Sequence, residues 1–566
     1  MNAAMLRILI VGGYGVFGGR LAQLLADEAR FTLIIAGRSA ARARSFCDGL
    51  RAAATLIAAR VDRDGDLDAQ IEQIGPDIIV DASGPFQGYG DEPYRLVEAA
   101  LALGVSYLDL ADDSDFVGGI GRFDAAAKRR GVFILSGVSS FPVLTAAVVR
   151  HLARGLERVD TITGGVAPSP YAGVGPNVIR AIASYAGKPV PLTRDGQLSF
   201  GYGLAETMRY TICPPGRLPL RSTLFSLVDV PDLRLLPSQW PGLRSIWLGA
   251  GPVPEILHIA LNVLASAVRL GLLPSLAFLA PVFHRTINVL RWGEHRGGMF
   301  VHIEGATTGG ATVMRSWHLL AEGDDGPLIP SMSVEAIVRK CLGGEPPAPG
   351  ARPAMNELEL ADFAGVFGGR MIFTGTREHG ADHGDAPLYK RILGAAWEQL
   401  PQQIRDMHDF AAAQTAEGRA DIERGASPLS RIIGWLFGFP RQAQGVPVTV
   451  RFTVDGRRET WTRQFGAHSF SSVHTEGSGR SDKLLEERFG PFSFGLALVA
   501  SPDRLSFVVR RWKVFGLPLP VALAPFGDSF EFVADGCFHF DVEIALPLVG
   551  LIVRYHGSLE PSGPGL

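Results

Sequence analysis

The chain has 566 residues, with 54 lysines and arginines against 57 aspartates and glutamates and a formal net charge of −3. This length is too great for a single hydrophobic core and indicates about three domains. The near-neutral charge provides no basic field, so we expect no nucleic-acid partner. Four widely spaced cysteines form no Cys-x-x-Cys pair. We therefore expect neither a disulfide framework nor a metal site, and a cytoplasmic location.

Residues 8–38 combine an apolar run, a glycine turn, an amphipathic stretch and a second apolar run. The turn contains Gly13-x-Gly15-x-x-Gly18, the pattern that Rossmann folds place between their first strand and helix. Such glycines permit a tight turn, close approach of a pyrophosphate, and close packing of the helix on the sheet. The residues expected to meet a dinucleotide here, at a helix N-terminus, are Gly13, Tyr14, Gly15, Val16, Phe17 and Gly18.

The end of the second apolar run indicates which dinucleotide is bound. NAD sites usually carry an acidic residue there for the ribose 2′-hydroxyl, but this chain has Arg38 followed by Ser39. An arginine can form charge-assisted hydrogen bonds to a 2′-phosphate, and a serine adds a hydroxyl. We therefore expect NADP(H) in preference to NAD(H). The alternative for Arg38 is a solvated surface side chain.

Residues 1–144 alternate short apolar strands with helical patterns, which predicts a doubly wound parallel sheet of the Rossmann type. The carboxyl ends of its strands share one edge, where a ligand binds. Asp62 follows the third predicted strand, where it could meet the adenine end of a cofactor. The residues after the fourth strand, where a nicotinamide ribose would run, are Ala82, Ser83, Gly84 and Pro85.

Residues 145–380 mix helices, loops and alternating strands, and we expect an α+β substrate domain that covers the nucleotide edge. A hairpin is predicted between strands at 299–304 and 312–319. A proline-rich connector (344–353) and a polar one (379–386) lead to the next domain.

An unusually apolar segment at 256–283 has two uncharged runs, each too short for a spanning helix. In the first run a narrow polar stripe is expected from His258, Asn262, Ser266 and Arg269. Two interpretations stay open. Residues 256–292 could contact a membrane peripherally, at the inner membrane, or the segment could be a buried helix or the face of a homodimer.

Residues 387–561 have a different pattern from the preceding regions, with strands in place of alternating helices and strands. A helix is expected from Leu388 to about Ala413, followed by many short strands with turn residues between them. Near-regular antiparallel strands predict a curved sheet or barrel, which is either packed or holds an apolar ligand. The fold class is therefore α/β, with a Rossmann domain, an α+β domain and a mainly antiparallel β domain.

Residues 1–380 resemble the saccharopine-dehydrogenase-like oxidoreductases through GGYGVFGG, AGRS, VDASGPFQGYG, the Tyr107-Leu-Asp109-Leu segment and LSGVSSFPVLTAAVV. The resemblance implies a Rossmann domain, an α+β domain and NAD(P)-linked reduction, with some members acting on amino-acid imines and others on lipid-linked double bonds. It maps the phosphate loop onto the three glycines named above, the 2′-phosphate site onto Arg38 and Ser39, and the nicotinamide loop onto residues 83–85.

Two segments depart from that family pattern, namely Ala111-Asp112-Asp113 and Gly175-Pro176-Asn177, and substrate identity cannot be carried across them. The tail from about 387 resembles a bacterial domain of unknown function fused behind such reductases. The motifs that carry this resemblance are ETWxRxF at 459–465, ERFGP at 487–491 and LVGLIVxYHG at 548–557.

Hydride transfer requires positioning, electrostatics and at most one proton donor from the protein. Asp109 ends a predicted strand on the ligand edge and is the favoured acid or base, with Tyr107 beside it; the alternative for Asp109 is a capping carboxylate. Further candidates near the nicotinamide are Tyr89, Asp112, Asp113 and Tyr171.

Two functions are compatible with these patterns. One is an NADP(H)-dependent oxidoreductase acting on a small, apolar or lipid-like substrate. The other is a non-catalytic NADP-binding sensor, or a membrane-associated scaffold, with a ligand-binding β domain.

Overall fold

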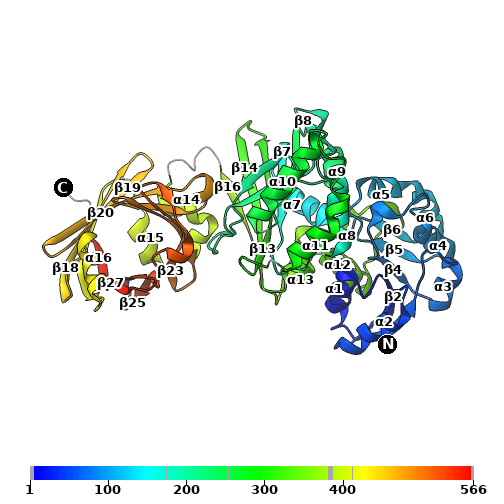
Figure 1. Cartoon of the computed structure of the whole chain (residues 1–566), viewed down its shortest axis with the longest axis horizontal. Coiled ribbons are helices and arrows are strands. Elements are labelled where there is room, and N and C mark those ends of the chain that lie inside the picture. Colours follow the sequence, from blue (N-terminus) through cyan, green and yellow to red (C-terminus); the bar gives the residue numbers. More distant parts are fainter. Residues whose placement is uncertain are drawn as a thin grey trace. The chain divides into compact units, whose positions relative to one another are not determined.

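The computed structural model describes residues 5–173, 175–252, 254–289, 291–379, 386–410 and 412–562 (Figure 1). The chain divides into two compact units. The first comprises Met1–Met208 with Leu224–Phe373, and the second comprises Arg209–Thr223 with Thr374–Leu566. The expected Rossmann domain and most of the expected α+β domain share the first unit. Most of the predicted polar connector at 379–386 lies outside the described residues.

The first unit contains the predicted parallel sheet, with strand order β15-β6-β5-β4-β1-β2-β3. Its sides are buried alternately: Ile8 and Ile10 face one hydrophobic cluster, while Leu9 and Val11 face another. Helices therefore cover both faces, as a doubly wound fold requires. The first six strands are β1 (Leu6–Val11), β2 (Phe31–Gly37), β3 (Thr55–Arg60), β4 (Ile78–Asp81), β5 (Ser106–Asp109) and β6 (Phe133–Ser136). The helices between them are α1 (Val16–Leu25), α2 (Ala40–Gly49), α3 (Leu67–Ile74), α4 (Arg95–Leu103), α5 (Ser114–Gly119) and α6 (Asp124–Arg130).

The seventh strand comes from the segment predicted to be a proline-rich connector. Its last residues form β15 (Gly350–Pro353), which pairs in parallel with β6. The Asp124 side chain accepts a hydrogen bond from the Ala351 backbone N–H at 3.1 Å, and Pro353 ends the strand. A proline is tolerated here because β15 is an edge strand. The connector interpretation was therefore wrong for 350–353.

The second sheet of the chain is mixed, with order β10-β11-β12-β7-β13-β14-β16. The predicted hairpin is present, and its strands are longer than expected. The strands are β7 (Leu156–Ala167), β10 (Thr207–Tyr210), β11 (Thr223–Leu227), β12 (Ser245–Ala250), β13 (Arg296–Thr307), β14 (Thr312–Glu322) and β16 (Ile372–His379), with a separate hairpin of β8 (Pro189–Arg194) and β9 (Gln197–Tyr202). The helices are α7 (Thr145–Leu152), α8 (Pro176–Tyr185), α9 (Asp232–Gln239), α10 (Glu255–Arg269), α11 (Ala280–Val289), α12 (Ile329–Leu342) and α13 (Leu360–Phe367).

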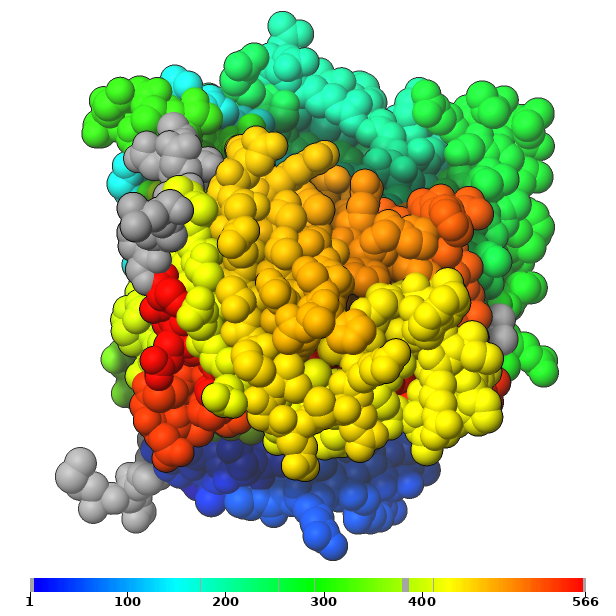
Figure 2. Space-filling model, turned by 90° about the vertical axis from the view of Figure 1, so that its left-hand side faces the viewer, coloured from blue at the N-terminus to red at the C-terminus, as the bar shows by residue number. Residues whose placement is uncertain are grey.

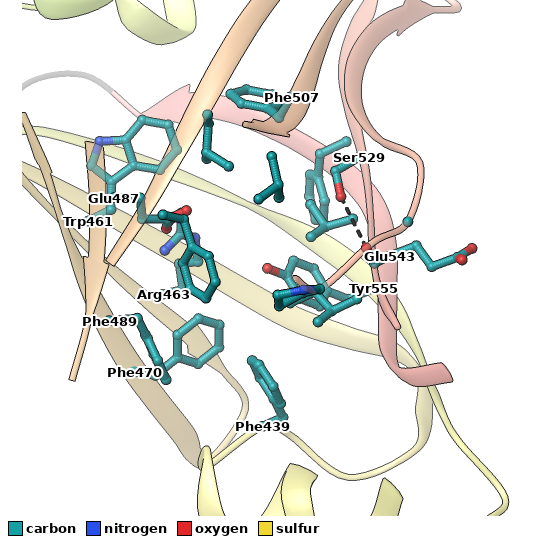
Figure 3. Close-up of a pocket in the computed structure, with 18 of the residues that line it drawn as sticks. Phe439, Trp461, Arg463, Phe470, Glu487, Phe489, Phe507, Ser529, Glu543 and Tyr555 are labelled. Carbon is teal, nitrogen blue, oxygen red and sulfur yellow. Dashed lines mark hydrogen bonds and ion pairs between the residues drawn. The ribbon is translucent and has the colours of Figure 1, made fainter. Parts of the chain in front are cut away.

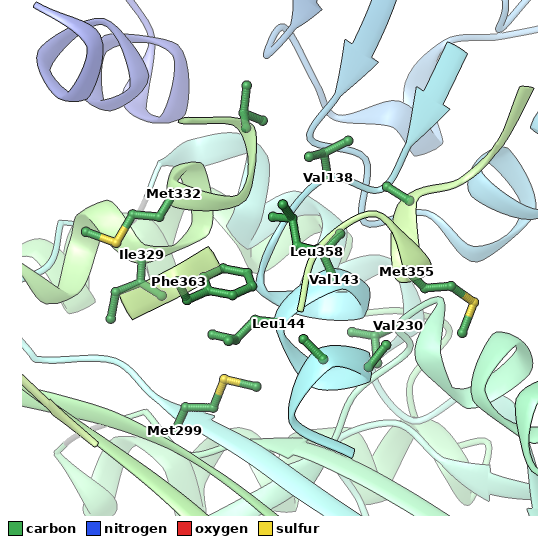
Figure 4. Packing of buried hydrophobic residues seen from close by; sticks show 14 of the residues in the cluster. Val138, Val143, Leu144, Val230, Met299, Ile329, Met332, Met355, Leu358 and Phe363 are labelled. Carbon is green, nitrogen blue, oxygen red and sulfur yellow. The ribbon is translucent and has the colours of Figure 1, made fainter. Parts of the chain in front are cut away.

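One hydrophobic cluster connects the two sheets of the first unit. Figure 4 shows Leu144, which directly precedes α7, among side chains from distant parts of the chain, including Met299 of β13, Met332 of α12 and Phe363 of α13. Leu144, Met332 and Phe363 are fully buried. Because this cluster is shared, the helices that follow the second sheet also support the parallel sheet.

The polar stripe of α10 faces inward. His258 is 2% exposed and lies 2.7 Å from the Ser226 hydroxyl, while the Arg269 guanidinium stacks on Tyr202. The outward side is apolar instead, and large exposed side chains continue into the following loop and α11: Ile256, Ile259, Val263, Leu270, Leu272, Phe278, Val282 and Val289. The interpretation of this segment as a helix buried on all sides is therefore wrong. Among the described residues, no helix is both long and apolar enough to cross a membrane.

The second unit is built on a closed antiparallel barrel. Ten strands follow the order β22-β21-β20-β19-β18-β17-β27-β26-β25-β23, and β22 pairs with β23 to close the ring. Figure 2 looks onto one face of this unit, where a recess opens between its yellow and orange segments. The ring strands are β17 (Gln414–Arg424), β18 (Ala443–Asp455), β19 (Arg458–Phe465), β20 (His468–Glu476), β21 (Leu485–Phe489), β22 (Phe492–Ala500), β23 (Arg504–Val514), β25 (Ser529–Ala534), β26 (Cys537–Leu546) and β27 (Gly550–Ser562). A short β24 (Leu517–Pro518) pairs antiparallel with the end of β23.

The single helix expected over 388–413 is broken. It forms α14 (Leu388–Leu393), a 3₁₀ segment over Gly394–Gln399 and α15 (Gln402–His408). Gly394 has a φ of 57°, and Pro401 precedes α15, so neither position continues a helix. A further helix, α16 (Pro428–Leu436), was not predicted.

Candidate active site

A cleft of about 1240 Å³ lies in the first unit at the carboxyl ends of the parallel strands. Its floor consists of the turns that follow β1, β2, β3 and β4. The first residues of α8 form part of its wall. Most of the predicted cofactor residues are brought together here: Tyr14, Gly15, Val16, Phe17, Arg38, Ser39, Asp62, Ala82, Ser83, Gly84 and Pro85.

The glycine turn after β1 has no room for side chains. A Cβ on Gly15 would lie 2.9 Å from the Gly12 carbonyl oxygen, and one on Gly18 would lie 2.4 Å from the same atom. Gly13 and Gly18 pack behind the turn and do not line the cleft. Gly12, which we did not predict, has a φ of 80° and approaches Ala82, so only glycine fits there easily. The turn brings the N-terminus of α1 to the cleft with no side-chain cap.

Two arginines stand at the end of β2. Arg38 is exposed, lines the cleft, and has no side-chain hydrogen bond or ion pair within the described residues. Arg42 lies one helical turn further on, with its guanidinium carbon 4.8 Å from the centroid of the Tyr14 ring. Ser39 caps α2 and donates its backbone N–H to the Tyr14 hydroxyl at 3.1 Å. Arg38, Ser39 and Arg42 therefore form a cationic patch, and Tyr14 contacts two of its residues, Ser39 and Arg42.

Asp62, the residue expected near the adenine end of a cofactor, also lines the cleft. Its backbone N–H donates to Gln70 at 2.8 Å, and its carboxylate lies 3.4 Å from the Arg60 guanidinium. These contacts hold the turn after β3 against α3.

A hydrogen-bonded cluster forms the turn after β4. The Ser83 hydroxyl donates to Asp81 at 2.5 Å and lies 2.8 Å from the Tyr89 hydroxyl. The Arg63 guanidinium stacks on the Tyr89 ring, 3.2 Å from its centroid. Burial is the main cause of a raised pKa for the Tyr89 hydroxyl. The side chain of Asn177 from α8 donates to the Gly84 carbonyl, which ties the two walls together.

The structure places Asp109 and Tyr107 inside the core, and neither lines the cleft. Both are 0% exposed. Asp109 accepts hydrogen bonds from the backbone N–H groups of Ala111 and Gly137 and from the Ser136 hydroxyl. Burial raises the pKa of Asp109 to about 7 despite these bonds. Asp109 thus ties together the ends of β5 and β6, which is close to the capping alternative.

Asp112, which belongs to one of the departing segments, does reach the cleft. The Gln87 side chain donates to it at 3.2 Å, and desolvation by the surrounding protein raises the pKa of its carboxyl group. Asp229 also has a raised pKa, because of its burial, and accepts a hydrogen bond from Ser114. Asp112 is therefore a carboxyl group of raised pKa that lines this end of the cleft.

The remaining candidates have structural partners. Asp113 caps α5 by accepting from the Phe116 N–H at 2.7 Å, and Tyr171 packs its ring on His295. Among the described residues, no group of three or more histidines, cysteines, aspartates or glutamates could hold a metal ion. Of the cleft residues that we did not predict, Arg42 follows the Ala-Gly-Arg-Ser motif by one turn of helix and could have been anticipated. Gly12 and Arg63 gave no comparable signal.

Residues 8–132 match the family model described as the saccharopine dehydrogenase NADP binding domain, and residues 400–559 match a domain of unknown function, DUF4166. Both resemblances expected from the sequence are confirmed. None of the curated proteins matches the chain.

Several solved structures are similar to the chain. One is saccharopine dehydrogenase (L-Glu forming) from Saccharomyces cerevisiae, at 12% identity and a TM-score of 0.46, with 66% of this chain and 100% of that chain covered. Another is biliverdin reductase from Synechocystis in complex with biliverdin and NADP+, at 13% identity and a TM-score of 0.29, with 60% and 92% covered. At such scores, no detail of their sites is transferred to this chain.

The parallel sheet, the glycine turn and the matched family model together define residues 8–132 as a domain similar to the saccharopine dehydrogenase NADP binding domain, which supports a dehydrogenase or reductase. Behind that domain the chain carries a closed antiparallel barrel that includes most of the DUF4166 match.

Proposed function

We propose that this protein is an NADP(H)-dependent oxidoreductase that reduces an apolar, lipid-like substrate. The observation that carries the proposal is the arrangement of the cleft. A glycine turn and a helix N-terminus lie between the cationic patch after β2 and the polar turn after β4. A dinucleotide needs these three features in this order: a site for the ribose 2′ position, one for the pyrophosphate and one for the nicotinamide ribose.

The residues present suit NADP(H) better than NAD(H). Arg38 has no carboxylate partner among the described residues, and Arg42 adds a second cation at the same end. No acidic residue stands at the end of β2 to accept bonds from a free 2′-hydroxyl. The Ser39 hydroxyl already caps α2, yet it can still donate a hydrogen bond to a phosphate oxygen.

The nicotinamide supplies a hydride when the cofactor is bound. The protein's part is to position the reactants and to hold a proton. Asp112 is our candidate for the proton donor because it lines the cleft and its raised pKa favours the protonated carboxyl group. Ser83 and Tyr89 are held by their hydrogen bonds to Asp81, and they would position the nicotinamide ribose of a bound cofactor.

The apolar surface of α10 and α11 supports a lipid-like substrate. Helix α11 packs on α8, whose first residues line the cleft. Arginines border the apolar side chains at Arg269, Arg285 and Arg291, so the face combines apolar and cationic groups. We propose that this face rests on an anionic lipid surface, from which the substrate is drawn.

Titration of the full chain with NADPH and NADH tests the cofactor. Binding of NADPH at least tenfold tighter than NADH is expected, and equal affinity would contradict the role of Arg38. Turnover is then tested with matched apolar and polar enals, ketones and imines, by following NADPH oxidation. Oxidation that requires an apolar acceptor supports the proposal. Tight NADPH binding without turnover of any acceptor would favour the sensor.

A further inference from the structure

The interior of the C-terminal barrel contains a cavity of about 440 Å³. Small-molecule sites in proteins commonly have volumes of roughly 300–1,000 Å³. Native cores, by contrast, contain few voids larger than a water molecule. Figure 3 shows aromatic rings turned towards this space, among them Phe470, Phe489 and Phe507 from three strands and Phe439 from the segment after α16. The cavity is therefore too large to be a packing defect, and its wall is mostly apolar.

A polar cluster stands on one side of the cavity. In Figure 3, Arg463 and Glu487 lie beside the ring of Trp461. The Arg463 guanidinium is 3.6 Å from the Glu487 carboxylate, and the His474 imidazole Nε2 is 3.1 Å from it. Burial favours the neutral acid, but His474 and Arg463 together outweigh it and lower the pKa of Glu487 to about 2. The charges of the cluster are thus paired within the wall.

Two polar atoms of the wall have no partner among the described residues. They are the Tyr389 hydroxyl and His474 Nδ1, and their residues are 0% and 2% exposed. Glu487 is ionised and can only accept, so His474 Nε2 carries a proton towards it. The other nitrogen, Nδ1, accepts a hydrogen bond in a neutral ring and donates one in a protonated ring, and the Tyr389 hydroxyl can donate. Buried polar groups in native proteins nearly always have partners, so an occupant is expected to supply them.

We propose that the barrel binds a largely apolar molecule with one uncharged polar end, a hydroxyl or a carbonyl. The aromatic wall takes the apolar part, and Tyr389 and His474 take the polar end. An anionic end is disfavoured because three carboxylates line the cavity, on Glu487, Glu531 and Glu543, against the single guanidinium of Arg463. A cationic end finds the two innermost carboxylates already paired, Glu487 as above and Glu531 with His408 at 2.7 Å. This site is independent of the proposed function of the cleft.

The test uses the full chain and four probes of equal chain length: 1-decanol, decanal, decanoate and decylammonium. Binding is measured by isothermal titration calorimetry. Decanol or decanal is expected to bind saturably with one site per chain, and more tightly than the two ions. Tyr389→Phe removes only the unpartnered hydroxyl. It should leave the unfolding temperature of the chain unchanged or higher and weaken decanol about fivefold to tenfold, the value of one hydrogen bond.

Two further variants locate the binding site. Val509→Trp fills the cavity and should abolish binding, and Leu496→Phe on the paired strand position is a milder filling variant in case the first does not fold. Trp435→Ala removes an apolar side chain that is 79% exposed on α16 and should change nothing. The proposal is overturned if no probe binds, if an ion binds as tightly as decanol, if Tyr389→Phe binds decanol like the wild type, or if Trp435→Ala removes binding.

Discussion

The cleft of the first unit and the cavity of the second place acidic groups in opposite electrostatic surroundings. In the cleft, desolvation by the surrounding protein raises the pKa of Asp112, and no cation among the described residues offsets this effect. In the cavity, Glu487 is flanked by Arg463 and His474, and its pKa is lowered to about 2. The comparison shows that nearby charged groups, as well as burial, decide which protonation state a carboxyl group adopts. The surroundings of Asp112 in the cleft therefore favour its protonated form, while those of Glu487 in the cavity favour the charged form.

The largest expected effect tests the acid of the cleft. Asp112→Asn should lower the rate of NADPH oxidation by about 100-fold or more, the usual contribution of a general acid. NADPH affinity should not change. In the wild type the rate should fall as pH rises through the raised pKa, because the proton is then lost.

The control is Asp115→Asn, which replaces an exposed carboxylate three residues further on that does not line the cleft. Its rate should match the wild type. An Asp112→Asn enzyme with the wild-type rate and pH profile would remove Asp112 from the mechanism.

A second test concerns the fixed charge of the cavity. Because folding lowers the pKa of Glu487 from about 4.3 to about 2, the ionised group stabilises the fold above pH 4 by roughly 3 kcal/mol. That stabilisation is lost as pH falls from about 4 to about 2. Glu487→Gln should therefore unfold the second unit at a lower temperature at pH 7 and approach the wild type below pH 3.

Calorimetry of the full chain measures this effect, with the transition of the second unit assigned by proteolysis and mass spectrometry. Glu560→Gln, on an exposed position of β27, should stay within about 0.5 kcal/mol of the wild type. If the unfolding temperature of Glu487→Gln stays below that of the wild type by the same amount in acid, the charge of Glu487 is not the cause of the difference.

The third test concerns cofactor choice. Arg38→Ala should weaken NADPH about tenfold to 100-fold, because a charge-assisted bond contributes about 1.5–3 kcal/mol, and should leave NADH unchanged. Arg44→Ala on α2, the helix that follows Arg38, removes an exposed arginine that does not line the cleft and should affect the binding of neither cofactor. Equal losses for both cofactors in Arg38→Ala would contradict a 2′-phosphate contact.

The smallest effect on stability is expected at the apolar face of α10. Val263 is 64% exposed, so Val263→Asp should change the free energy of unfolding by no more than about 0.5 kcal/mol. It should nevertheless reduce sedimentation with anionic phosphatidylglycerol vesicles. Leu198→Asp, at an apolar position of β9 that is 76% exposed, is the matched control. Equal vesicle binding by wild type and Val263→Asp would argue against membrane contact through this face.

The sequence by itself determined the features that depend on residues close together along the chain. Gly13, Gly15 and Gly18 belong to one turn, and Arg38 follows the next strand, so local spacing was enough to predict their grouping at one sheet edge. Strands β1 to β6 of the parallel sheet and most strands of the barrel could likewise be predicted from apolar periodicity and turn residues, whereas the pattern at β15 predicted a connector. Only their closure into a ring was left open.

The tertiary structure alone decided which polar groups face a ligand. Asp109 and Asp112 are three residues apart, yet one ties two strand ends together inside the core while the other lines the cleft. The polar stripe of α10 was visible in the sequence, but its inward direction depends on Ser226, a partner from a distant strand. The cavity cluster likewise joins Tyr389, Arg463, His474 and Glu487 from α14 and three strands. Periodicity specifies that a face exists, whereas its surroundings are set by residues far along the chain, and those surroundings decide burial and charge.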